Sequence, residues 1–188
     1  TDDIVIPRFL GGPMNLYLRL LKVLMHVWFS AGKGIMDESR LCFRVWLHDC
    51  DLNMHLNNGR YLTFMDLGRI HLIGQMKLLG KLIKNRWMPV LGAAEINFIR
   101  PIKPLQKFLL TSRMLAWDEK YFYIEQRFAV EEDKLCAVAL VKGLFMAGGE
   151  KVKPEDILRL FGRAPPAPEM PDTIKHWNQL LAMKRQLP

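Results

Sequence analysis

The chain is poor in cysteine, and its cysteines lack the spacing that would make them informative. Only three occur among its 188 residues, and Cys42, Cys50 and Cys136 form no C-x-x-C pair. An odd number of widely spaced cysteines argues against a secreted disulfide scaffold and favours a reducing compartment. We therefore expect a cytoplasmic protein.

The chain also lacks an apolar run long enough to cross a membrane. Its most apolar stretch, residues 16–29, is shorter than the roughly 20 residues that a spanning helix needs. Arg19, Lys22 and His26 interrupt this stretch instead of preceding it, which argues against a signal peptide. At about 100° per residue these three fall on one narrow polar stripe of an otherwise apolar helix. We expect the helix either to dock against the domain or a dimer partner, or to make peripheral contact with a membrane through residues 14–30.

Acidic residues are outnumbered by basic ones, 19 to 27, which gives a formal net charge of +8. This balance favours anionic partners such as nucleic acid, an anionic membrane surface or the phosphates of CoA. The basic residues are scattered and no RNA-binding signature accompanies them, so we expect no nucleic-acid partner. A solvated basic surface is the plain alternative reading.

Half of the residues are hydrophobic and 24% are charged, which suits one domain with a substantial core and some additional elements. We divide the chain into an amphipathic helical extension at 1–38, a central domain at 39–150 and a helical tail at 151–188. The tail begins with a short helix and continues through a proline-rich linker.

The hydrophobic pattern predicts a strand, a long helix and then four strands. The strand alternates over residues 40–48, and the helix over 58–79 is apolar nearly all round, so a sheet must curl around it. Turn residues separate the later elements, which are strands at 90–99, 108–117, 121–130 and 135–146, followed by helices at 154–161 and 172–185. Short connections predict that consecutive strands are antiparallel neighbours. The fold class is α+β, an antiparallel sheet wrapped around one long central helix, with extra helices at both ends.

The segment most informative about function lies immediately before the long helix. Residues 51–61 read D-L-N-M-H-L-N-N-G-R-Y, which brings a carboxylate, an amide and an imidazole close to a helix start. The first turn of a helix offers unpaired backbone N–H groups and a partial positive charge. An acid and a histidine beside it provide a place to hold a carbonyl oxygen while a base activates water.

These residues resemble known acyl thioesterases of the hotdog superfamily. Residues 46–51 followed by Tyr61 resemble the 4-hydroxybenzoyl-CoA thioesterase pattern, and the alternating polar residues of 51–58 are similar to the plant acyl-ACP thioesterase motif. The run 46–69, with the turn at 117–120, is most similar in appearance to thioesterase superfamily member six-type proteins. The resemblance covers roughly residues 40–148 and implies the hotdog fold and hydrolysis of acyl-CoA or acyl-ACP in fatty acid metabolism.

The resemblance also implies roles for particular residues. Asp51 is the expected base or nucleophile, and Asn53 and His55 are expected to orient water or the carboxylate. Backbone N–H groups near Asn58 and Gly59, in the first turn of the helix, would bind the developing oxyanion. The residues expected to contact substrate are Asn57, Asn58, Gly59, Tyr61, Asp66, Arg100 and Lys103, with Met65, Met76, Trp87 and Met88 as candidates to line an acyl tunnel. CoA or ACP enters as part of the substrate, without a separate cofactor or a metal. Because an open edge strand seeks a partner, we expect a homodimer or a dimer of dimers.

Several of these residues have plainer explanations. Asp51, Asn57 and Asn58 are also ordinary turn and N-cap residues. Asp66 and Arg69 have the spacing of an ion pair within one helix. Two other functions remain open: a hotdog dehydratase acting on acyl thioesters, and a non-enzymatic protein that binds acyl lipids or a membrane surface. The dehydratase pattern calls for a histidine followed by proline and glycine before the helix, which this chain does not supply.

Overall fold

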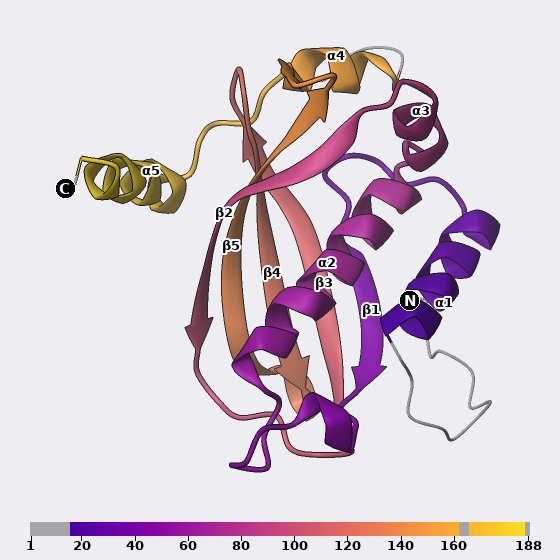
Figure 1. The fold of residues 1–188 in the computed structure, drawn as a ribbon, viewed down its shortest axis with the longest axis vertical. Coiled ribbons are helices and arrows are strands. Elements are labelled where there is room, and N and C mark those ends of the chain that lie inside the picture. Colours follow the sequence, from indigo (N-terminus) through magenta and orange to yellow (C-terminus); the bar gives the residue numbers. More distant parts are fainter. Residues whose placement is uncertain (1–15, 162–165, 187–188) are drawn as a thin grey trace.

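The computed structural model describes residues 16–161 and 166–186, and its centre is an antiparallel sheet that curls around one long helix (Figure 1). The sheet has six strands in the order β1-β3-β4-β5-β2, with β6 paired to β5. Their bounds are β1 Ser39–Arg44, β2 Met88–Phe98, β3 Lys107–Trp117, β4 Phe122–Val130, β5 Lys134–Ala147 and β6 Glu150–Val152. The predicted α+β architecture is confirmed.

The central helix, α2 (Asn58–Gln75), lies across the concave face of the sheet (Figure 1). Its apolar residues enter the main core, with Phe64 and Met65 fully buried. Gly68 lets the helix approach the sheet closely, because a Cβ there would lie 2.7 Å from both Ser112 Oγ and Gln126 Nε2. The enclosure expected from the helix's all-round apolarity is therefore confirmed.

The predicted neighbour relation between the second and third strands is wrong. β2 pairs with β5, and β3 pairs with β1, so β2 and β3 are not adjacent. The connection at 99–106 runs from β2, at one edge of the sheet, to β3, which lies next to β1 at the opposite edge. It is fixed there because Val45 and Leu105, together with Gln106, extend the β1–β3 pairing through backbone hydrogen bonds of 2.8 and 3.0 Å. A short connection thus joins strands that are far apart in the sheet.

Two predicted elements are shorter than expected. The first strand ends at Arg44, and a 3-10 turn at Leu47–Asp49 replaces its last residues. The long helix ends at Gln75, and a separate short helix, α3, spans Leu79–Lys84. The break coincides with Lys77, whose φ of 55° interrupts the helical path. The short strand β6 was not predicted.

Helices from the two ends of the chain pack on opposite faces of the domain. α1 (Leu16–Phe29) lies beside α2, and α5 (Asp172–Lys184) lies on the outer face of the sheet (Figure 1). α5 buries Ile174 and Trp177 against Ala116 and Tyr123, which confirms its predicted amphipathic face. α4 (Pro154–Arg159) packs at the end of the sheet, and residues 1–15 of the predicted extension lie outside the described part of the chain. Within the described residues, no helix is both long and apolar enough to cross a membrane.

Candidate active site

The loop before α2 is a compact turn whose two ends, at Cys50 and Leu56, are paired with each other. A bridge between Cys50 and Leu56 closes it, and inside it Asp51 N–H donates to His55 O at 3.0 Å. Met54 adopts a φ of 56°, a conformation that non-glycine residues rarely adopt and that is concentrated at functional sites. Leu56 N–H donates to Ile102 O at 2.9 Å, so the loop is joined to the 99–106 connection. Motif residues are therefore held on a defined backbone at one end of the sheet.

Asp51 is partly buried, and its carboxylate has a local role as well as the proposed chemical one. Asp51 Oδ1 accepts a hydrogen bond from the backbone N–H of Asn53 at 2.9 Å, so the Asp51 side chain closes a turn with the backbone two residues later. The Asn53 side chain is exposed, and His55 is partly buried. The backbone thus brings the three predicted catalytic residues into one turn.

The start of α2 uses some of the N–H groups proposed for the oxyanion. Asn57 is the N-cap, and its Oδ1 accepts the N–H of Gly59 at 2.8 Å. Asn57 N–H itself donates to Asp49 O at 2.9 Å. In the described part of the chain the N–H of Asn58 makes no hydrogen bond. Of the two predicted oxyanion donors, Asn58 therefore offers the open group and Gly59 is already bonded.

Asp49 is a buried carboxylate that the sequence analysis did not single out. It is fully buried and accepts two hydrogen bonds from Arg19, at 2.9 and 2.6 Å, and one from Trp46 N–H at 2.9 Å. Burial alone would raise its pKa, but the bonds from Arg19 and Trp46 and the charge of Arg19 outweigh this, so the pKa of Asp49 is lowered. The signal available in the sequence was Arg19, a cation inside an apolar helix that requires an anionic partner.

Two basic residues predicted to contact substrate lie on the 99–106 connection beside the loop. Arg100 is exposed and donates from Nη1 to Leu135 O at 2.8 Å, which fixes its direction and leaves other guanidinium N–H groups for a ligand. Lys103 is exposed, and its backbone N–H donates to Gln106 Oε1 at 3.0 Å. Both cations are therefore at the same end of the sheet as the motif.

Tyr61, in the first turn of α2, packs in an aromatic cluster. Its ring lies 5.0 Å from that of Phe98 and 4.8 Å from that of Phe128, and 2% of the residue is exposed. Burial raises the pKa of Tyr61 to about 12, with a smaller effect from the Cys136 thiol. The ring therefore supports the start of α2 through packing.

Asp66 and Arg69 form the predicted ion pair on α2. Arg69 also donates to Gln126 Oε1 at 3.0 Å, and Gln126 Nε2 donates to Met65 O and to Ser112 Oγ. Burial lowers the pKa of Arg69, and the charge of Asp66 partly restores it. This network joins the middle of α2 to the sheet.

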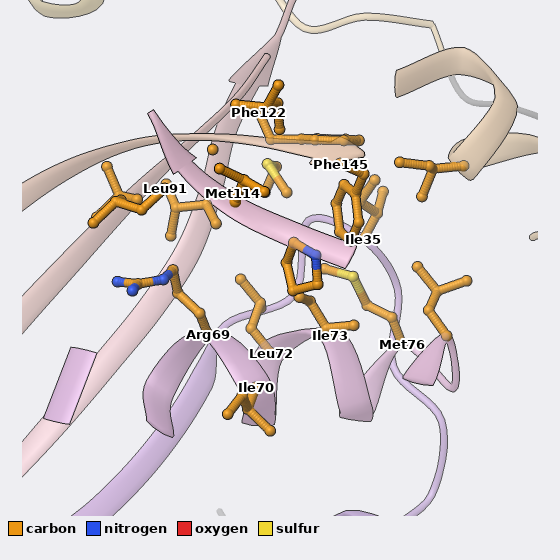
Figure 2. Close-up of a pocket in the computed structure, with 18 of the residues that line it drawn as sticks. Ile35, Arg69, Ile70, Leu72, Ile73, Met76, Leu91, Met114, Phe122 and Phe145 are labelled. Carbon is orange, nitrogen blue, oxygen red and sulfur yellow. The ribbon is translucent and has the colours of Figure 1, made fainter. Parts of the chain in front are cut away.

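An apolar cavity of about 320 Å³ opens beside that ion pair, between α2 and the sheet (Figure 2). Its volume is at the lower end of the ~300–1,000 Å³ typical of small-molecule sites. Among the residues that the structure describes, Asp66 and Arg69 are the only charged ones that line it; the other lining residues include Ile35, Ile73, Met76, Leu91, Met114, Phe122, Phe145 and Leu158. Of the four residues predicted to line an acyl tunnel, Met76 lines this cavity, and Met65, Trp87 and Met88 are not among its lining residues.

The described residues contain no group of three or more histidine, cysteine, aspartate or glutamate side chains placed to hold a metal ion. His48 lies 3.5 Å from Asp49 Oδ1, but Arg19 already occupies that carboxylate.

Comparison with known proteins points to one family. The model of the thioesterase-like superfamily matches residues 45–178. A probable thioesterase of Saccharomyces cerevisiae is 34% identical over 118 residues, which cover 61% of this chain and 50% of the yeast protein, so the chain spans about half of that relative. Protein THEM6 of Danio rerio is 31% identical over 173 residues, covering 90% of this chain and 84% of the fish protein.

Solved structures share the fold at low sequence identity. A probable thioesterase from Escherichia coli superposes with a TM-score of 0.59 at 22% identity, covering 65% of this chain and 94% of the bacterial one. A Thermus thermophilus thioesterase, solved with coenzyme A and zinc, gives a TM-score of 0.54 at 22% identity, with coverages of 66% and 95%. These likenesses confirm the predicted hotdog fold.

Proposed function

Because the chain belongs to the thioesterase-like superfamily, we propose that it hydrolyses acyl thioesters of coenzyme A or of an acyl carrier protein. The observation that carries the proposal is the placement of Asp51, Asn53 and His55 in one turn at the start of α2, with an apolar cavity farther along the same helix. Hydrolysis needs a base, an oxyanion site and a place for the acyl chain. Each has a candidate on this side of the sheet.

In the proposed reaction Asp51 takes a proton from a water molecule as that water attacks the thioester carbonyl carbon. The C–S bond then breaks, and the proton passes to the departing thiolate, with His55 able to relay it. Direct attack by the Asp51 carboxylate, followed by hydrolysis of the resulting anhydride, uses the same residues. Asn53 would orient the water through its side-chain amide.

The oxyanion is assigned to the N-terminal turn of α2. The N–H of Asn58 is open, whereas that of Gly59 is bonded to Asn57. A preorganised N–H at the positive end of an 18-residue helix stabilises negative charge on the carbonyl oxygen. Gly59 still allows the substrate to approach the backbone closely.

The acyl chain is assigned to the apolar cavity. Asp66 lies eight residues beyond Asn58, which is about 12 Å along a helix. A thioester held at the start of α2 would therefore reach the cavity only with an extended acyl chain, and this favours long aliphatic substrates. Arg100 and Lys103 are proposed to bind the phosphates of CoA at the other end of the substrate. This reaction uses no separate cofactor.

The protein is proposed to work as a homodimer, or a dimer of dimers, that associates through β2. This strand is at the end of the sheet order, and its large apolar residues Met88, Val90, Leu91 and Phe98 are each more than 40% exposed. An exposed apolar edge strand pairs readily with a second copy. Pro89, Val90 and Leu91 also line the cavity, so a partner at this edge would cover its outer wall.

The proposed compartment is cytoplasmic. No disulfide joins the three cysteines, all of which lie in the described part of the chain. Buried and partly buried thiols of this kind are typical of proteins from reducing compartments.

Thiol release from a panel of acyl-CoAs tests the proposed reaction. The panel runs from acetyl to palmitoyl and includes benzoyl-CoA, with a parallel preparation from cells lacking the protein as background. We expect release above background, with long aliphatic chains preferred. If the protein binds these acyl-CoAs tightly but releases no thiol from them or from the matching acyl-ACPs, the result would instead favour a non-enzymatic protein that binds acyl lipids.

A further inference from the structure

The most unusual feature of the molecule is the orientation of α1. Its polar stripe faces the protein, where Arg19 is 3% exposed, and its wide apolar side faces outward. The outward side carries Tyr17, Leu18, Leu21, Leu24, Met25, Trp28 and Phe29, which are between 40% and 85% exposed. An amphipathic helix on a protein surface normally has the opposite orientation.

Polar contacts fix the first half of α1 in this orientation. The Arg19 guanidinium bonds both oxygens of Asp49 and lies 4.7 Å from the centroid of the Phe64 ring. Removing either charge would leave the other buried and unpaired, which is strongly destabilising. Rotation of α1 to bury its apolar side would therefore break a fully enclosed ion pair.

The second half of α1 is held by contacts of its own. Lys77 Nζ donates to the backbone oxygens of Val27, at 2.9 Å, and Ser30 at the helix end. The imidazole ring of His26 stands edge-on to that of His71 at 5.1 Å. Val27 packs so tightly on Gly74 that a Cβ at Gly74 would lie 2.5 Å from Val27 Cγ1. The apolar side is thus presented outward by contacts within the chain.

The chemistry of the outward side fits a lipid surface. α1 contains no aspartate or glutamate, Lys22 lies at the edge of the apolar side, and Lys33 follows the helix. Together with the formal net charge of +8, these cations favour anionic headgroups. Tyr17 and Trp28 are residue types that favour the boundary between headgroups and acyl chains, and Phe29 is typical of the apolar face of an interfacial helix.

A second copy of the chain fits this surface less well. A helix of 14 residues presents an area of about 21 Å by about 10 Å, well below the roughly 800 Å² per partner of a stable protein interface. α1 lies beside α2 near β1, whereas the exposed edge strand β2 is at the other end of the sheet order (Figure 1). The two surfaces are therefore separate.

We propose that the outward side of α1 inserts into the interfacial region of an anionic phospholipid membrane, with the helix parallel to the surface. The first turns of α1 are joined to the motif loop through Arg19 and Asp49, so a docked helix would hold that loop close to the lipid. Long-chain acyl thioesters are amphiphilic and concentrate at such surfaces.

Vesicle flotation of the full chain tests this proposal, with vesicles of phosphatidylcholine alone and of phosphatidylcholine with phosphatidylserine. We expect binding to the anionic vesicles, weakened by salt. Leu21→Glu and Trp28→Glu should each reduce binding at least about tenfold. Met183→Glu on α5, an apolar residue of similar exposure (65%), is the matched control and should leave binding unchanged. Urea midpoints and molecular mass by light scattering accompany each variant.

Three results would overturn the proposal. The first is a wild-type protein that binds neither kind of vesicle, and the second is binding that Trp28→Glu leaves intact. The third is a fall in molecular mass for the α1 variants, which would assign this face to a second copy of the chain. None of these readouts depends on hydrolysis, so the proposed reaction is tested separately.

Discussion

Two aspartates two residues apart, Asp49 and Asp51, have opposite environments. Asp49 is enclosed, bidentate with Arg19 and held in its charged form, which makes it a structural anion. Asp51 is partly exposed on the loop, and within the described part of the chain its carboxylate accepts a hydrogen bond from the N–H of Asn53 alone, which leaves its second oxygen for a ligand. The sequence identified Asp51 through its motif, but the role of Asp49 depends on Arg19, a residue 30 positions away. Pattern analysis does not detect such a pairing.

His71 provides a prediction about pH at the residue scale. It is fully buried, its Nδ1 lies 2.6 Å from Ser39 Oγ, and its Nε2 has no hydrogen-bond partner among the described residues. Burial, with smaller contributions from His26 and Lys33, lowers the pKa of His71 to about 3. Between that value and the ordinary pKa of about 6.5, the unfolded chain binds a proton that the folded chain does not.

The free energy of unfolding should therefore decrease as the pH falls from about 6.5 toward 3, with this proton contributing a slope of up to about 1.4 kcal/mol per pH unit. Urea denaturation across this range measures it. His71→Gln should flatten the slope, and His176→Gln, on the exposed side of α5, should leave it unchanged. Equal slopes for His71→Gln and the wild type would contradict this account.

At the scale of elements, hydrophobic periodicity predicted the long helix and the four main strands to within a few residues. It did not predict which strands are neighbours, because pairing of β2 with β5 depends on the path of the 99–106 connection. Nor did it predict which way α1 faces. The sequence shows the polar stripe of α1. However, Asp49, His71 and Lys77, which contact that helix, come from two other segments of the chain.

The close packing of α1 on α2 at Gly74 makes the stability of the protein sensitive to a substitution there. Gly74→Ala should lower the free energy of unfolding by about 1–3 kcal/mol, because the new Cβ would meet the stiff side chain of Val27 and force the helices apart. Gly80→Ala, in α3, is the control: nothing lies within 4 Å of its Cβ position, so it should be neutral or stabilising by up to about 1 kcal/mol. Urea midpoints distinguish the two variants. Equal effects would mean that α1 is not held against Gly74.

For the whole molecule, composition and pattern predicted one α+β domain with additional helices, and the comparisons confirmed the hotdog fold. The tail proved closely attached to that domain. β6 extends the sheet, Ile157 and Leu158 of α4 line the cavity, and Trp177 of α5 is buried on the outer face. The hydrophobic pattern along the sequence does not show that such distant segments line one cavity together.

Assembly through β2 is tested at the same scale. Leu91→Lys places a charge on the exposed edge and should convert the proposed dimer to a monomer in sedimentation equilibrium. Leu180→Lys, on α5, changes a residue of similar exposure, 43% against 46%, and should not alter the molecular mass. A mass that Leu91→Lys leaves unchanged would move the dimer contact away from this part of the edge.

We propose that Asp51 performs the chemistry while the fold holds the substrate. The most direct measurement is the turnover of the preferred acyl-CoA by Asp51→Asn, with its binding measured by titration on the same preparation. We predict that turnover falls at least about 10²-fold, the usual contribution of a general base, while binding and the urea midpoint stay close to wild type. Unchanged turnover would remove Asp51 from the mechanism and contradict the account.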